Sequence, residues 1–160
     1  MKKTINTYFK IALTINVLII TAVLYIQYFL NIKPCSVCFL ERYPYYLSIV
    51  IILIYFINKK FEKYLLFSLI LISCISFLLA LYHSGLELGF IKDSTLCKAS
   101  TADYLNKDTI LKNLENNTLP SCKNVSFKFV GLSLASYNIL SSLSFLILYC
   151  KVFLWIKKKR

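Results

Sequence analysis

The sequence predicts an all-α membrane protein, a bundle of four transmembrane helices with a long extracytoplasmic loop between the third and the fourth. Of its 160 residues, 58% are hydrophobic and only 16% are charged, and the mean hydropathy is +0.66, all outside the usual range of a soluble domain. The apolar residues gather in four stretches, each close to the ~20 residues that cross a ~30 Å hydrocarbon core.

The first two spans are expected at residues 11–30 and 37–57. The N-terminal segment also resembles a secretory signal peptide, but no small-residue cleavage site follows it, so we treat it as a retained helix. In the second span the uninterrupted apolar part alone is too short to cross a membrane. We therefore expect its helix to begin near Val37, with Cys38, Glu41 and Arg42 in its first turns.

The third and fourth spans are expected at residues 64–82 and 132–150. They enclose the longest polar segment, residues 83–131, which becomes the outer loop of the bundle. No internal repeat or low-complexity tract divides the chain, so residues 1–160 are predicted to form one integral membrane domain.

The net charge of +12 is explained by membrane topology. The basic residues do not follow one polar face together with stacking aromatic residues, which argues against a nucleic-acid-binding protein. They cluster at both termini and between the second and third spans, and four spans place these three segments on one side of the membrane. Because short basic segments stay in the cytoplasm, we expect cytoplasmic termini and an extracytoplasmic loop.

Four of the six cysteines fall in or beside the extracytoplasmic segments, where disulfides form and persist: Cys35, Cys38, Cys97 and Cys122. The other two, Cys74 and Cys150, lie within the third span and near the cytoplasmic end of the fourth. We interpret these two as unpaired apolar thiols and assign them no function.

The C-x-x-C spacing of Cys35 and Cys38 favours a redox function. A ring closed over so few residues removes little chain entropy, so this disulfide would add little stability as a purely structural bond. The alternative is a zinc site, which needs two further ligands. Cys97 and Cys122 would complete four thiolates, but they are too widely spaced to form a second zinc knuckle, and we expect no metal.

Arg42 follows Cys38 by four residues and is expected on the same helix face, about one turn deeper. A cation at the membrane boundary requires an anionic or polar partner, and a thiolate or a reduced quinone would serve. Together with the positive end of the helix, Arg42 would stabilise Cys38 as a thiolate. The alternative is an arginine that extends to the membrane surface and pairs with Glu41 or a lipid phosphate.

His83 and Glu87 lie at helical i, i+4 spacing at the end of the third span. An imidazole at this position would hydrogen-bond to a bound redox partner or transfer a proton to it. An interfacial histidine whose nitrogens are satisfied by backbone or water fits the sequence equally well.

Four features together resemble the bacterial disulfide bond formation protein B (DsbB) family: CSVCFLER at the second span, YHSGLELG after the third, the loop pair Cys97 and Cys122, and SFKFVGLSLASYN entering the fourth. The resemblance covers nearly the whole chain. It implies a four-helix bundle in the bacterial inner membrane that reoxidises a periplasmic DsbA-like dithiol protein of thioredoxin fold. It also implies that the electrons pass to a membrane quinone, ubiquinone or menaquinone, so that disulfide bond formation continues.

The resemblance further implies how the four extracytoplasmic cysteines act in turn. A thiolate of the partner attacks Cys97, and Cys122 leaves and attacks Cys35. Cys38 then leaves as a thiolate beside the quinone. By the same resemblance, Arg42 belongs to the redox motif beside the quinone, and His83 and Glu87 fit the motif after the third span. We expect Arg42 and His83 to bind the quinone.

Two other functions remain open at the level of sequence. A quinone enzyme like vitamin K epoxide reductase is also a helical membrane thiol oxidoreductase, but it usually carries its C-x-x-C near the last helix. A membrane adaptor would use a bond between Cys97 and Cys122 only to staple its outer loop, which leaves Cys35, Cys38 and Arg42 unexplained. Quinone-dependent oxidation of a dithiol protein distinguishes the adaptor from the enzymes.

Overall fold

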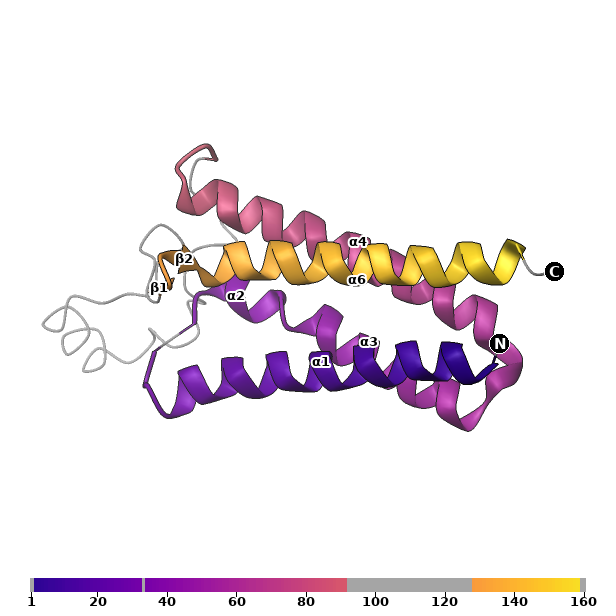
Figure 1. Ribbon diagram of the computed structural model, residues 1–160. Coiled ribbons are helices and arrows are strands. Elements are labelled where there is room, and N and C mark those ends of the chain that lie inside the picture. The colour runs from indigo at the N-terminus through magenta and orange to yellow at the C-terminus, as the bar shows by residue number, and fades with distance from the viewer. Residues whose placement is uncertain (1, 33, 92–127, 159–160) are drawn as a thin grey trace, which may run out of the picture.

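The computed structural model describes residues 2–32, 34–91 and 128–158. These residues form the following elements (Figure 1): α1 (Lys2–Tyr28), α2 (Ser36–Leu40), α3 (Tyr43–Ile57), the 3-10 turn η1 (Lys59–Phe61), α4 (Glu62–Glu87), β1 (Lys128–Phe129), β2 (Leu132–Ser133) and α6 (Leu134–Lys158).

Within the described residues, four segments are long and apolar enough to cross a membrane, as the sequence predicts: Thr4–Tyr28, Ser36–Ile57, Lys59–Glu87 and Leu134–Lys158. Large apolar side chains such as Leu18, Leu78 and Leu154 stay exposed on their outer faces. A surface of this kind matches lipid tails, and helices satisfy their own backbone groups within the bilayer.

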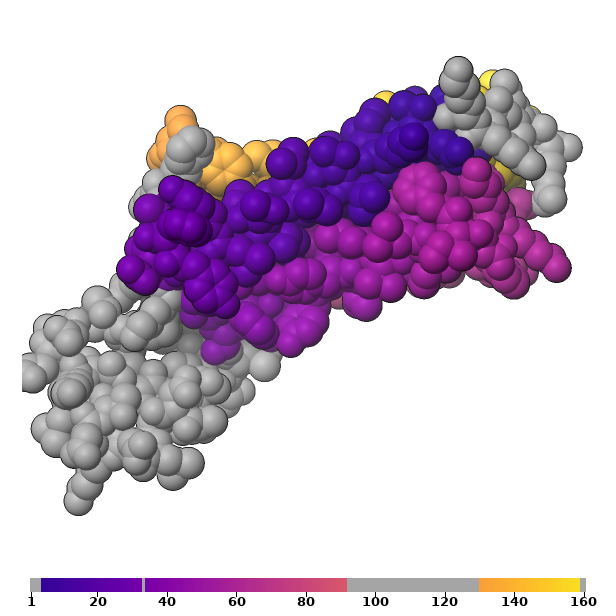
Figure 2. All heavy atoms as spheres, turned by 90° about the horizontal axis from the view of Figure 1, so that it is seen from below, coloured from indigo at the N-terminus to yellow at the C-terminus, as the bar shows by residue number. Residues whose placement is uncertain are grey.

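Helix α4 packs extensively against α6 and also against α3, and α3 packs against α1. In Figure 2, α1 (indigo) lies along the side of the purple and magenta segment that follows it in the sequence. The main apolar core joins these four helices, and in it the Phe9 and Tyr55 rings stack with centroids 4.2 Å apart. The Tyr55 hydroxyl donates a hydrogen bond to Asn6 Oδ1 at 2.7 Å, which ties α3 to the first turns of α1.

The two chain ends and the turn between α3 and α4 lie at one end of the bundle, while α2 and the β1–β2 hairpin lie at the other (Figure 1). The basic residues of η1 and of the last turn of α6 therefore gather at the terminal end. The Cys35–Cys38 segment lies at the opposite end, as the four-span topology predicts.

The second span is broken where the sequence predicts one helix. Helix α2 ends at Leu40, and α3 begins at Tyr43 with Pro44 in its first turn. Pro44 has no N–H to donate to the Leu40 carbonyl, and its ring crowds that carbonyl. The turn tightens instead, with Arg42 N bonded to Phe39 O at 3.2 Å. Glu41 and Arg42 lie at this turn and bond to different helices, Glu41 to α4 and Arg42 to α1.

The fold is helical, as predicted, apart from a short antiparallel ribbon, β1 paired with β2, that precedes α6. Its two-residue turn holds Val130 at φ 51° and Gly131 at φ 81°. Positive φ at both central residues is the geometry of the tight hairpin turn that matches strand twist. The predicted outer loop, residues 83–131, is thus shortened from both sides: α4 continues to Glu87, and the ribbon begins at Lys128. Residues 92–127, with Cys97 and Cys122, lie outside the described residues.

Candidate redox site

Cys35 and Cys38 form a disulfide at the start of α2, with their Cα atoms 5.1 Å apart. Cys35 is the N-cap of this helix in an extended conformation, and its Sγ accepts a hydrogen bond from the Cys38 backbone N–H at 3.1 Å. The extended backbone follows from Pro34 on one side and the helix start on the other. The helix start therefore contacts the sulfur of Cys35, whereas the sequence interpretation assigns that stabilisation to Cys38.

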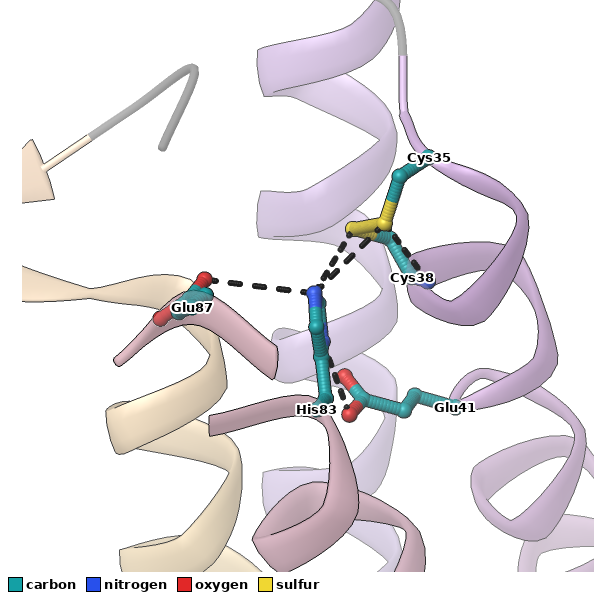
Figure 3. The surroundings of a disulfide bond; sticks show 5 residues. All are labelled: Cys35, Cys38, Glu41, His83 and Glu87. Atoms are coloured by element: carbon teal, nitrogen blue, oxygen red, sulfur yellow. Dashed lines mark hydrogen bonds and ion pairs between the residues drawn. A yellow bond between two sulfur atoms is a disulfide. The ribbon is translucent and has the colours of Figure 1, made fainter. Parts of the chain in front are cut away.

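His83 reaches the disulfide from α4 (Figure 3). Its Nε2 lies 3.5 Å from Cys35 Sγ and 3.7 Å from Cys38 Sγ, and only 3% of the residue is exposed. The sequence left open either a bond to a bound redox partner or an interfacial histidine satisfied by backbone or water. The structure places His83 against the Cys35–Cys38 disulfide, a contact that neither interpretation names.

Glu41 holds the other side of the imidazole. Its Oε1 lies 3.0 Å from His83 Nδ1, and the residue is 8% exposed. A carboxylate at this distance accepts the Nδ1 proton, which orients the ring and leaves Nε2 for the sulfurs. Glu87 lies on the opposite side of the ring, 3.9 Å from Nε2 (Figure 3), too far for a hydrogen bond.

Apolar side chains enclose the disulfide. Val37 and Leu86 are buried against Cys35, and the partly buried Tyr82 and Ile91 pack around them. Ile91 folds back over the end of α4, where its N–H bonds to the Gly85 carbonyl at 3.2 Å. A Cβ at Gly85 would come within 2.8 Å of the Ile91 side chain. The low-polarity surroundings strengthen the Glu41–His83 interaction relative to the same pair in water.

Arg42 is buried, with 7% of its surface exposed, and faces a different neighbour from the one predicted. Its Nη1 donates to Gln27 Oε1 on α1 at 2.5 Å, and its guanidinium lies over the Phe39 ring, 5.7 Å from the centroid. Arg42 Nε is buried without a hydrogen-bond partner. Its burial and its bond to Gln27 argue against an arginine that extends to lipid phosphate. The Nε–H group is a donor that could still bond to a further acceptor.

Glu41 and Gln27 are the site residues that the sequence interpretation missed. Glu41 enters that interpretation only as a possible partner of Arg42, yet an acid inside an apolar span is itself a signal of function. Gln27 near the end of the first span carried a weaker signal of the same kind. Cys74 and Cys150 are free thiols, and the structure gives them no place in this cluster.

The fold and the cluster define a class of protein: a multi-pass membrane protein with a buried disulfide in contact with a carboxylate-bound histidine. The chain also matches the family model described as "Disulfide bond formation protein DsbB" over residues 5–152, and it belongs to this family. Membership implies a membrane thiol oxidoreductase that takes part in disulfide formation.

A curated relative is the uncharacterized protein RP370 of Rickettsia prowazekii (strain Madrid E). It is 27% identical over 139 residues, which cover 86% of this chain and 81% of the relative. No solved structure gives a significant match.

Proposed function

We propose that this protein reoxidises a periplasmic DsbA-like dithiol protein and passes the electrons to a membrane quinone. The observation that carries the proposal is the disulfide with His83 Nε2 at 3.5 Å from one sulfur and 3.7 Å from the other. A purely structural bond needs no ionisable group against its sulfurs, and burying the Glu41–His83 pair costs desolvation free energy. Thiol–disulfide exchange, by contrast, needs the leaving sulfur to be stabilised as it gains charge.

Electrons enter through the loop pair Cys97 and Cys122 in this proposal, and Cys122 then attacks Cys35. The bond between Cys35 and Cys38 breaks, and Cys38 leaves with the electron pair. His83 in its protonated form donates from Nε2 to that sulfur, and Glu41 stabilises the imidazolium from Nδ1. Among the described residues, the cation in contact with the new thiolate is therefore His83, and not Arg42 as the sequence suggested.

Arg42 offers a group that fits a quinone. Arg42 Nε is a buried donor without a partner, and a quinone carbonyl is an acceptor that would satisfy it. Arg42 and His83 are the residues that would hold the group. When bound, a quinone accepts the two electrons and two protons that leave a dithiol. In this second half of the cycle His83 acts as a base: it takes a proton from the dithiol as the Cys35–Cys38 bond forms again.

The decisive test uses the protein purified in mild detergent. We expect quinone to co-extract with it, and we expect added quinone to be reduced while a reduced thioredoxin-fold dithiol protein is oxidised. A membrane adaptor with a stapled loop has no reason to do either. Absence of both quinone and quinone-dependent oxidation after gentle extraction would overturn the proposal.

Family membership and the position of the C-x-x-C in the second span favour this function over an enzyme like vitamin K epoxide reductase.

Arg42→Leu is expected to raise the apparent KM for a soluble quinone analogue by roughly 10- to 100-fold, the cost of losing one hydrogen bond to a charged group. Arg42→Lys should be intermediate because lysine keeps the charge without the planar fork. Steady-state quinone reduction measures both, and Gln27→Ala serves as a control that removes only the protein partner of Nη1. An unchanged KM in Arg42→Leu would mean that Arg42 only joins α1 to α3.

The redox end is proposed to face the periplasm of a bacterial inner membrane, with both termini in the cytoplasm. The basic residues at the terminal end support this orientation. A membrane-impermeant thiol reagent added to reduced spheroplasts should therefore label Cys97 and Cys122 and spare Cys150. Labelling of Cys150 before lysis would invert the orientation and move the site to a reducing compartment.

A further inference from the structure

We propose that the reduced form of the redox site binds Zn²⁺ through Cys35, Cys38 and His83, and that the metal holds the dithiol in its reduced state until it is removed. This inference rests on the proposed function, because the function supplies the reduced form. The two sulfurs and the imidazole nitrogen all lie within 4.8 Å of one another. The sequence analysis considers only Cys97 and Cys122 as further ligands for the C-x-x-C, whereas the fold brings in His83, which lies 45 residues beyond Cys38.

The distances fit a tetrahedral site. Bond lengths of ~2.3 Å to sulfur and ~2.0 Å to nitrogen place the nitrogen ~3.5 Å from each sulfur around a tetrahedral zinc. His83 Nε2 already lies 3.5 Å from Cys35 Sγ and 3.7 Å from Cys38 Sγ. Only the two sulfurs must separate, to ~3.8 Å, and reduction of the disulfide permits this. The fourth position is taken by water.

Glu41 completes the arrangement that zinc-binding histidines use. Its carboxylate lies 3.0 Å from Nδ1, so the proton is held on Nδ1 and the Nε2 lone pair is directed at the sulfurs. A carboxylate behind a ligating histidine raises the basicity of the ligand and fixes its ring. Thiolate and imidazole donors are the set that suits zinc.

The site is gated by redox state. In the oxidised protein both sulfurs are bonded to each other and offer no thiolate, so one imidazole remains as a ligand. In the reduced protein the three ligands converge. Binding of Zn²⁺ forms two Zn–S bonds and one Zn–N bond and releases the two thiol protons, and no electrons move. The bound metal occupies the sulfur lone pairs and thereby blocks reoxidation.

The experiment uses full-length protein in detergent, with ZnCl2 as the probe. The variant Cys74→Ser/Cys97→Ser/Cys122→Ser/Cys150→Ser leaves only Cys35 and Cys38, so that no other thiol competes. We expect the reduced protein to bind one Zn²⁺ in competition with a chromophoric chelator, and the disulfide form to bind at least 100-fold more weakly. Equal binding by the two redox forms would overturn the inference.

Further variants locate the metal. His83→Gln should weaken binding by at least tenfold, and Glu41→Gln, which keeps all three ligands, by roughly 10- to 100-fold. Glu62→Gln at the far end of α4 is the matched control and should not change the affinity. Co²⁺ in place of Zn²⁺ should give a thiolate charge-transfer band and tetrahedral d–d bands. Unchanged affinity in both Glu41→Gln and His83→Gln, or an octahedral cobalt spectrum, would refute the proposed ligands.

Activity measured on the same preparation separates this inference from the proposed function. Reduced protein freed of dithiothreitol is mixed with quinone, so that the Cys35–Cys38 dithiol is the electron donor and no small dithiol competes for the metal. One equivalent of Zn²⁺ should slow the quinone reduction in this single turnover at least tenfold, and a chelator should restore it. Quinone reduction without zinc binding would refute the metal site alone. Zinc binding without any quinone reduction would refute the proposed function and leave the metal site standing.

Discussion

Cys35→Ser and Cys38→Ser are each expected to abolish quinone reduction with any electron donor, a loss of at least ~10³-fold. Both sulfurs are needed because each reduction cycle breaks and remakes the one bond between them. The variants should still fold, since a ring closed over so few residues contributes little to stability. Quinone absorbance measures the activity, and gel filtration with circular dichroism checks the fold.

Cys97→Ser and Cys122→Ser provide the matched control. They should block oxidation of the protein partner, and quinone reduction by dithiothreitol should continue, because a small dithiol reaches the Cys35–Cys38 bond directly. A Cys97→Ser/Cys122→Ser protein that oxidised the partner at the normal rate would contradict the two-pair relay. Activity remaining in Cys35→Ser would contradict the site itself.

The number and order of the spans were predictable because hydropathy follows directly from composition. The ends of the helices were not: α1 and α6 run past the predicted spans at the terminal end. Polar and basic residues such as Lys10 and Lys151 continue a helix as well as apolar ones, although they lower the hydropathy that marks a span. Hydropathy therefore locates the buried part of a membrane helix and not its caps.

The site was predictable where the chemistry is local and not where it depends on the backbone. C-x-x-C spacing indicates a redox pair in any fold, so Cys35 and Cys38 could be recognised directly. Glu41 pairs with His83 on α4, and Arg42 pairs with Gln27 on α1, at the tightened turn before Pro44; these are tertiary contacts that the spacing of the sequence does not show. A continuous helix, the sequence expectation, would have kept Arg42 on the face of Cys38.

His83→Gln is expected to lower the rate at which the Cys35–Cys38 disulfide is reduced by roughly 10²- to 10⁴-fold, the range for loss of a positioned proton donor. Glutamine keeps the size and polarity of the side chain but carries no transferable proton. The ratio of the wild-type rate to the His83→Gln rate should be largest at acid pH, where the imidazole is protonated, and should narrow as the pH rises. Stopped-flow measurement with a dithiol donor gives this ratio, and a ratio that is flat with pH would contradict proton donation.

Glu41 enters the same argument as a positioning residue, since it touches His83 at 3.0 Å and neither sulfur is among its contacts. Glu41→Gln alone should slow disulfide reduction, because an amide neither stabilises the imidazolium nor fixes the ring as firmly. If Glu41 acts only through His83, the double variant Glu41→Gln/His83→Gln should be no slower than His83→Gln. Glu87→Gln, on the far side of the ring, is the matched control and should cost less than Glu41→Gln. Additive losses in the double variant would show that Glu41 acts on the reaction by a route of its own.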